Sequence, residues 1–191
     1  MMKNLLIVSI LLISSISFSQ EKFEKEYRID FSEAPQKSQQ IITKWEFPKK
    51  VKWYAEESND GKTFEAKTCF QKHRYSIEFS EIGNILDVEK TVKFKKLERN
   101  LQLIINKALS KNYKKFKIKK TQIQLKGTEN ELYKMIFELK SITKSITRNY
   151  ELIVKAKKDN DYDLYEILFD ENGNIIKELK FKPINSINLE F

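Results

Sequence analysis

The chain has 191 residues, of which 40% are hydrophobic and 33% are charged, and its formal net charge is +9. This composition allows a sizeable hydrophobic core, as one compact domain or two small fused halves. Four glycines and three prolines exclude a collagen-like or linker-rich chain, and a single cysteine excludes an internal disulfide.

The first 19 residues have the pattern of a secretory signal peptide. Lys3 gives a short basic segment, residues 5–18 are apolar or small, and Ser17 and Ser19 place small side chains before a cleavage point at Gln20. The apolar run is shorter than the roughly 20 residues that a transmembrane helix needs. No cysteine follows it, which argues against a lipoprotein anchor. We therefore expect an exported protein, periplasmic or secreted, without a membrane span.

The first half of the chain predicts one helix and four strands. Residues 20–35 are charged and are interpreted as a mobile leader, in which Tyr27, Ile29 and Phe31 can form a short edge strand. Residues 38–47 carry apolar side chains at helical spacing and are followed by a proline. Alternating apolar residues and turn residues then predict strands near 49–55, 64–70, 75–79 and 85–89.

The second half repeats this order. One broad apolar stripe predicts a helix over residues 95–112. Residues 114–118 resemble residues 49–53 and predict a strand of the same kind. Three further strands are expected near 150–156, 165–169 and 175–181.

The second half differs from the first by an insertion near residues 127–148. Thr128 and Glu131 form a capping-box pattern that favours a helix. A strand is the alternative, because Tyr133, Met135 and Phe137 also alternate with other residues.

The two halves share a hairpin signature. Residues 75–85 and 165–175 match without a gap, with Tyr, Ile and Phe at alternate positions before Gly-Asn and Ile. The match predicts Gly83 and Gly173 in equivalent turns. We therefore predict an α+β fold, in which two tandem helix-plus-four-strand antiparallel units form one curved sheet with helices on one face.

This combination of signal peptide, paired units and duplicated hairpin resembles the exported PepSY-like domains with a β-lactamase-inhibitor-like (BLIP-like) fold. The resemblance covers most of residues 36–182. It implies a small non-catalytic exported protein that binds another protein or peptide, for example as an enzyme inhibitor or regulator. The corresponding division is a signal peptide (1–19), a leader (20–35), a first PepSY/BLIP-like unit (36–94), a second unit (95–182) and a C-terminal tail (183–191).

Residues suited to catalysis or metal binding are few in the sequence. Cys69 and His73 are the only cysteine and histidine, and no third group is in view to orient the imidazole. Residues 170–174 look like a calcium loop, but Phe181 occupies the place of the expected bidentate carboxylate. Phosphate-binding, dinucleotide and serine-hydrolase motifs are missing. We expect no enzyme, no cofactor and no metal.

The positive charge is concentrated in residues 93–120 and 140–158. Such a surface can attract nucleic acid, anionic lipid or an acidic protein. An Arg-rich or aromatic-stacking motif is missing, so we expect no nucleic-acid partner and interpret the charge as a solvated surface.

The sheet face away from the helices is the candidate binding surface. If Trp53 and Ala55 face the helices, their neighbours in sequence point to the open face, where an exposed aromatic or aliphatic residue can anchor a partner. The alternative is a carrier of an apolar or anionic small ligand between the sheet and the inserted segment, which needs a cavity of a few hundred Å³. The candidate binding residues are Lys52, Tyr54, Lys67, Ile153 and Lys155.

Overall fold

The computed structural model describes residues 20–58, 60–138 and 145–181. The expected signal peptide (1–19) and C-terminal tail (183–191) lie outside these residues. The helices are α1 (Gln36–Trp45), α2 (Arg99–Asn112) and α3 (Glu129–Phe137), with short 3-10 helices at Phe31–Glu33 and Phe94–Lys96. The strands are β1 (Gln20–Lys22), β2 (Glu24–Ile29), β3 (Lys52–Ser58), β4 (Gly61–Phe70), β5 (His73–Ser80), β6 (Ile85–Thr91), β7 (Lys115–Lys126), β8 (Thr147–Lys157), β9 (Tyr162–Phe169) and β10 (Ile175–Phe181).

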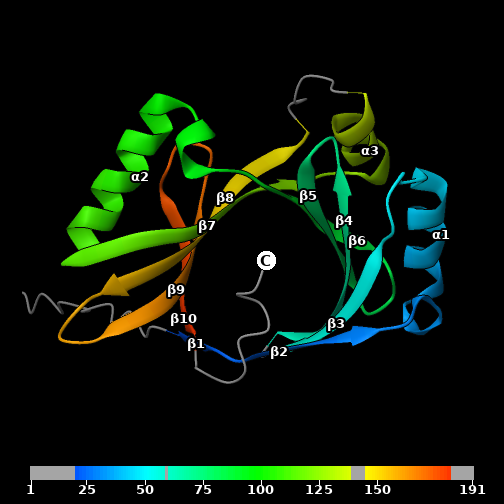
Figure 1. The fold of residues 1–191 in the computed structure, drawn as a ribbon, viewed down its shortest axis with the longest axis horizontal. Helices are drawn as coiled ribbons and strands as arrows, with labels where there is room; N and C mark the ends of the chain where they lie inside the picture. Colours follow the sequence, from blue (N-terminus) through cyan, green and yellow to red (C-terminus); the bar gives the residue numbers. More distant parts are fainter. Residues whose placement is uncertain (1–19, 59, 139–144, 182–191) are drawn as a thin grey trace, which may run out of the picture.

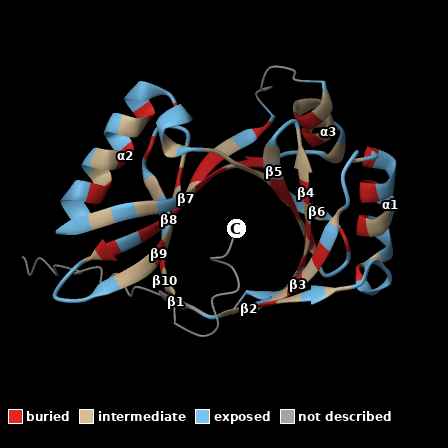
Figure 2. Ribbon diagram, in the orientation of Figure 1, coloured by how far each residue is buried: buried red, intermediate tan, exposed pale blue. Residues whose placement is uncertain are grey.

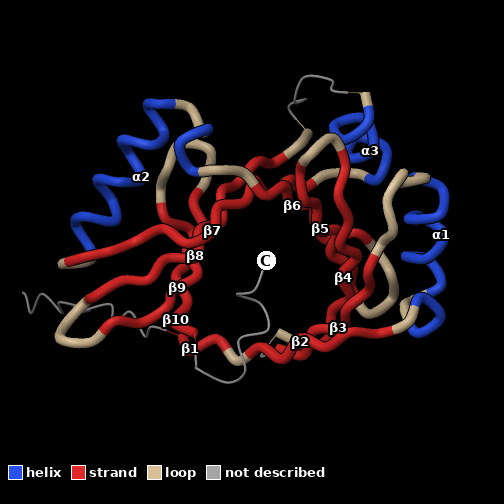
Figure 3. Tube along the Cα trace, in the orientation of Figure 1, coloured by secondary structure: helices blue, strands red, loops and turns tan. Residues whose placement is uncertain are grey.

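The described strands form one sheet that curls into a ring. Their order is β1-β10-β9-β8-β7-β6-β5-β4-β3-β2. Strands β2 to β10 are antiparallel to their neighbours, and β1 is parallel to β10. The helices lie outside the ring, so the sheet has a convex face toward the helices and a concave face toward the centre (Figures 1 and 3).

The N-terminal segment closes this ring. Strand β1 pairs with β10, while β2 pairs with β3 at the other edge of the sheet, and only Phe23 separates β1 from β2. The nine strands β2 to β10 alternate in direction, so β2 and β10 run the same way. Because β1 continues the direction of β2, the closing pair has to be parallel, as it is at Gln20↔Leu179.

The expected mobile leader is therefore part of the sheet. Tyr27 and Ile29 lie in β2, which agrees with the short strand expected there, whereas Phe31 begins a 3-10 helix. Residues 20–22 pair with β10, and residues 24–29 pair with β3. The sequence could not show this role, because the partner strand β10 lies at the far end of the chain.

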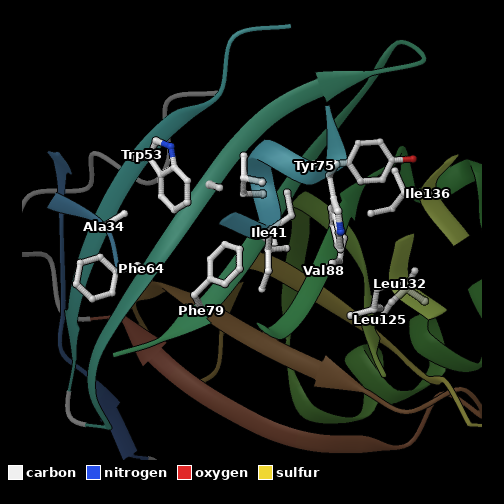
Figure 4. Close-up of a cluster of buried hydrophobic side chains, with 14 of the residues drawn as sticks. Ala34, Ile41, Trp53, Phe64, Tyr75, Phe79, Val88, Leu125, Leu132 and Ile136 are labelled. Atoms are coloured by element: carbon white, nitrogen blue, oxygen red, sulfur yellow. The ribbon is translucent and has the colours of Figure 1, made fainter. Parts of the chain in front are cut away.

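The convex face of the sheet and the helices enclose two hydrophobic clusters. The helices contribute side chains at helical spacing, and the strands contribute alternate residues, which is why buried residues recur along each strand (Figure 2). In the first cluster, Ile41 of α1 lies with Trp53 and Phe79 of the sheet (Figure 4). In the second cluster, Ile105 of α2 packs with Val154 and other strand residues.

The prediction of two tandem units is wrong, because the strands form a single meandering sheet. Strand β6 pairs directly with β7, as at Val88↔Leu125, so the sheet has no boundary between the halves. Helix α3 also packs Leu132 and Ile136 into the first cluster, which otherwise consists mainly of first-half residues. The inserted segment thus completes the core of the first half, and the two halves share their packing.

The two hairpin signatures nevertheless form the same local turn. Gly83 and Gly173 have φ values of 79° and 82°, a region that glycine adopts readily because it has no Cβ. Their amides donate to the carbonyls of Ser80 and Asp170, at 2.8 and 3.1 Å.

The helical interpretation of the insertion is confirmed for α3. The hydroxyl of Thr128 accepts a hydrogen bond from the amide of Glu131 at 3.4 Å, and the Glu131 carboxylate accepts one from the amide of Thr128 at 3.0 Å. This is the predicted capping box. Among the described residues, no helix is both long enough and apolar enough to cross a membrane.

Candidate functional site

The concave face of the sheet encloses a cavity of about 430 Å³. Its walls come from strands β2 to β10, whose alternate side chains point away from the helices. Ten carboxyl groups and four lysines give this lining a formal charge of −6, although the whole chain carries +9. The carboxyl groups are those of Glu24, Glu26, Glu56, Asp60, Glu65, Glu78, Asp87, Glu89, Glu151 and Glu166, and the lysines are Lys67, Lys120, Lys126 and Lys177.

Several of these carboxyl groups lie directly opposite one another on neighbouring strands. Glu26 of β2 is paired with Glu56 of β3. Glu78 of β5 is paired with Glu65 of β4 on one side and with Asp87 of β6 on the other. Directly opposed residues on one face have Cβ atoms about 4.5–5.5 Å apart, and like charges in such pairs destabilise a sheet. The acidic lining therefore works against the stability of the fold.

Lys67 neutralises part of this charge. Its Nζ atom lies 2.5 Å from the Oε1 atom of Glu26 and 2.8 Å from the Oε2 atom of Glu65. Burial favours a neutral Lys67, but the charges of Glu65 and Glu26 outweigh it and raise the lysine pKa. Burial also opposes ionisation of Glu65, yet Lys67 and a hydrogen bond from Ser76 hold the Glu65 pKa below its usual value. Glu65 is thus the ionised partner of Lys67.

Glu26 is held less firmly in the ionised form. Burial, followed by the charge of Glu65, raises the pKa of Glu26 to about 7. Its Oε1 atom contacts Lys67, whereas its Oε2 atom is buried and has no hydrogen-bond partner among the described residues.

Asp87 is the most deeply buried carboxyl group of the lining, with 2% of its surface exposed. Its Oδ2 atom accepts a hydrogen bond from Gln124 at 3.0 Å and lies 4.0 Å from the Nζ atom of Lys126. Its Oδ1 atom is buried without a hydrogen-bond partner in the described part of the chain. Burial, followed by the charge of Glu78, raises the pKa of Asp87 to about 8.

Glu89 follows Asp87 by two residues on β6, so both side chains point to the same face of the sheet. It accepts a hydrogen bond from the Nε2 atom of Gln122 at 2.5 Å. Burial, and then the charges of Glu151 and Asp87, raise the pKa of Glu89 well above its usual value. The cavity therefore holds three carboxyl groups, Glu26, Asp87 and Glu89, whose surroundings favour the protonated form.

A second hollow of about 620 Å³ adjoins the first and has the opposite charge. The two share several wall residues, including Glu65, Lys67 and Ser76. We call this hollow the basic mouth. Its cationic residues are Lys49, Lys50, Lys52, Lys67, Arg74, Lys119 and Lys120, and its one carboxyl group among the described residues is that of Glu65.

The structure brings three of the five predicted binding residues together at this basic mouth. Lys52, Tyr54 and Lys67 all line it, and the Nζ atom of Lys67 lies 4.7 Å from the centre of the Tyr54 ring. Lys155 lies elsewhere, with its Nζ atom 5.5 Å from the centre of the Tyr162 ring.

Ile153 was expected as an exposed anchor, and that expectation is wrong. Only 6% of its surface is exposed. It does point to the concave face, where its neighbours across the strands are Lys120 and Glu166. Because the sheet curls around this face, Ile153 lines the enclosed cavity and cannot serve as a surface anchor.

Sequence reasoning placed Lys67 and Ile153 on the face away from the helices but did not identify the carboxyl groups that line it, such as those of Glu78 and Asp87. A signal was present, since acidic residues recur at alternate positions in successive predicted strands. An acidic residue that alternates with apolar ones has the same pattern on a solvated face as in a polar cavity. Because exposed acidic residues are far more common than buried ones, the pattern alone favoured the interpretation that these residues face solvent.

Cys69 and His73 lie on the two strands of one hairpin but are not cross-strand partners. Cys69 is paired with Arg74, and His73 with Phe70. Both residues are half-buried. In the described ranges, no group of three or more His, Cys, Asp or Glu side chains is arranged to hold a metal ion.

No protein-family model, curated protein or solved structure matches this chain. The resemblance to PepSY-like domains therefore stays a prediction. The site has to be interpreted from its own geometry and charge.

Proposed function

We propose that this protein is a non-catalytic binding protein that holds a small ligand inside the ring formed by its sheet. The supporting observation is the cavity of about 430 Å³ on the concave face, which falls within the usual volume of ligand sites. The carrier expected from the sequence held its ligand between the sheet and the inserted segment, whereas this cavity lies on the opposite, concave face and is lined by no α3 residue. The proposal therefore keeps a small ligand but moves its site. The proposal includes export of the chain, which rests on the signal-peptide pattern in residues 1–19.

The chemistry of the walls also supports a ligand site. Ile153, Leu168 and Leu179 contribute apolar surface, while carboxyl, amide and hydroxyl groups converge from the other strands. Ligand sites commonly combine apolar walls with a few polar groups that orient the ligand. Buried carboxyl groups without full hydrogen bonding are unfavourable for folding, so their presence on this face points to a use other than stability.

A second candidate function is binding of an acidic protein or peptide at the basic mouth. Lys52, Tyr54 and Lys67 meet there, and an aromatic side chain among cations is a common anchor for a protein partner. This candidate retains the expectation that the chain inhibits or regulates an enzyme.

The proposal is tested by blocking the cavity with a bulky side chain. Thr63 lines the cavity on β4, so a Thr63→Trp substitution places an indole group inside the ring. Thr147 is exposed at the start of β8 and is not a wall residue, so Thr147→Trp is the matched control. Wild-type and variant proteins would be recovered from their own cell envelope without denaturation, and their intact masses measured by native mass spectrometry.

We expect a small-molecule mass increment on the wild type and on Thr147→Trp, and its loss from Thr63→Trp. An increment that persists in Thr63→Trp would place the ligand outside the cavity. Three proteins that all carry no small molecule would contradict the proposal. A protein partner that Tyr54→Glu releases would favour the second candidate.

A further inference from the structure

We infer that the ligand is an organic polycation, a molecule with two or more protonated amino groups such as a linear polyamine. This inference rests on the proposed function and adds the chemical class of the ligand. It differs from the apolar or anionic ligand expected from the sequence, because the lining of the cavity is acidic.

Two carboxyl groups in the wall have an oxygen atom that is ready to accept a hydrogen bond. The Oδ1 atom of Asp87 and the Oε2 atom of Glu26 are buried and have no partner among the described residues. The exposed fractions of these residues are only 2% and 7%. A buried acceptor without a donor is unfavourable, and an ammonium group supplies up to three donors as well as the opposite charge.

The carboxyl groups are also spaced to receive more than one cation. Glu65, Glu78 and Asp87 lie opposite one another on the consecutive strands β4, β5 and β6. Neighbouring strands are about 4.8 Å apart, so these groups form a row across the sheet. Amino groups joined by short methylene chains can contact successive members of such a row.

The other part of the cavity suits the carbon chain of such a ligand. Ile153, Leu168 and Leu179 lie on β8, β9 and β10, where Glu151 and Glu166 also line the cavity. A linear polyamine combines charged nitrogens with apolar methylene groups, which matches a wall where aliphatic and acidic side chains lie side by side, as Ile153 and Glu166 do.

Two other ligand classes fit the cavity less well. An anion would meet a lining with a formal charge of −6. A metal ion needs several ligands around one point, and the described carboxyl groups do not form such a cluster. The net charge of +9 also repels polycations from the outer surface, so binding of a polyamine would report on the cavity.

The test is isothermal titration calorimetry of the protein with spermine at pH 8.5 and physiological ionic strength. Suberate, a dicarboxylate, and octane-1,8-diol, an uncharged analogue, are the comparison probes. The variants are Asp87→Asn and Glu78→Gln in the acidic row, Thr63→Trp as the blocked cavity, and Asp163→Asn as the matched control. Asp163 lies outside the cavity lining and pairs with Lys180 at 2.9 Å. A thermal unfolding curve of each variant shows whether it is folded.

We expect spermine to bind the wild type and Asp163→Asn equally and to bind Thr63→Trp undetectably. Its affinity should fall about tenfold or more in Asp87→Asn and in Glu78→Gln, because the substitutions remove a buried charge at Asp87 and a half-buried charge at Glu78 that would face the ligand.

Each other outcome would overturn the inference. Suberate or the diol could instead bind the wild type but not Thr63→Trp, while spermine does not bind. The cavity would then hold a ligand of another class, and the proposed function would still stand. If spermine binds folded Asp87→Asn, Glu78→Gln and Thr63→Trp as well as the wild type, it binds elsewhere. If spermine does not bind the wild type at all, the polycation assignment is wrong, and the native mass measurement decides the proposed function separately.

Discussion

Glu78 on β5 and Asp87 on β6 lie directly opposite each other on the concave face of the sheet. Both line the enclosed cavity, and Asp87 has an oxygen atom without a partner among the described residues. Two opposed carboxyl groups lower the stability of an antiparallel pair. Because burial and the charge of Glu78 also raise the pKa of Asp87, the arrangement makes the stability of the protein depend on pH.

We predict that Asp87→Asn makes the ligand-free protein more stable at alkaline pH. The folded protein raises the Asp87 pKa from 3.8 to about 8, so the folded state favours protonation. The resulting stabilisation is complete below pH 3.8 and is lost as the pH rises through about 8. Asparagine stays neutral, and we expect the variant to be more stable by about 1–3 kcal/mol at pH 9 and similar to the wild type at pH 5. Thermal unfolding from pH 5 to pH 9 measures this difference, and a variant that is less stable at pH 9 would contradict the assigned shift.

We predict that polyamine binding strengthens as the pH rises from 6 to 9. Asp87 faces Glu78 from β5, Glu65 from β4 and Lys126 from β7, and its raised pKa keeps it largely protonated at neutral pH. Spermine has to displace that proton, whereas its own amino groups stay charged over much of this range, as lysine does. Calorimetry in buffers of different ionisation enthalpy should show that protons are released when spermine binds. The Asp87→Asn variant should release fewer protons. An affinity that is constant over this pH range would exclude the Asp87 carboxylate as a contact.

We predict that Lys67→Met destabilises the protein far more than Lys44→Met. Lys67 joins Glu26 and Glu65, and its removal leaves the buried Glu26 and half-buried Glu65 carboxyl groups without their cation, for a loss of about 2–4 kcal/mol at pH 8. Lys44 pairs with Glu129 at 2.8 Å on the surface, where such a pair contributes about 0–1 kcal/mol. Chemical denaturation at pH 8 and pH 5 provides the comparison. Recovery of Lys67→Met at pH 5 is expected, because protonation removes the uncompensated charge.

We predict that Gly83→Ala is more damaging than Gly61→Ala. Both glycines have positive φ values, so alanine is strained at either position, at about 1–2 kcal/mol. A Cβ atom at Gly83 would also lie 2.9 Å from the backbone nitrogen of Ser38 in α1, whereas a Cβ atom at Gly61 meets nothing within 4 Å. We expect about 2–4 kcal/mol of lost stability for Gly83→Ala, and equal losses would argue against close packing of α1 on this turn.

We predict that Leu132→Ala in α3 weakens the first hydrophobic cluster. Leu132 is fully buried in that cluster, and Leu→Ala at such positions typically reduces stability by about 2–5 kcal/mol. Leu103 in α2 is 62% exposed, so Leu103→Ala is the control, with an expected change within about 0.5 kcal/mol. Denaturant titration compares the two. A small effect at Leu132 would mean that the first half does not depend on α3.

The parts of the fold that depend on short-range patterns could be predicted from the sequence. Helix α2 has a continuous apolar stripe, and the Gly83 and Gly173 turns follow strands with strict alternation. The capping box at Thr128 likewise identified the start of α3, although the nearby alternation also fitted a strand. These signals depend on residues within a few positions of each other.

The closure of the sheet could not be predicted, because it depends on residues at opposite ends of the chain. Residues 20–22 are charged or polar and do not alternate like a strand, yet they pair with β10. Without this closure the concave face was expected to be open, so Ile153 was interpreted as exposed and the acidic residues as solvated. The cavity was therefore missed, even though Lys52, Tyr54 and Lys67 of the adjoining basic mouth lie in strands that the sequence predicted.

Among the described residues, the closing seam of the ring has the fewest residue pairs of any strand pairing. Strand β1 is held to β10 by three residue pairs, whereas β7 and β8 share eleven. Short strand pairings separate more readily than long ones, so the β1–β10 amides are expected to exchange with solvent before those of β7 and β8. Separation of this seam would turn the closed ring into an open curved sheet without disturbing either hydrophobic cluster. Under the proposed function, separation of these three pairs would widen the entrance to the cavity.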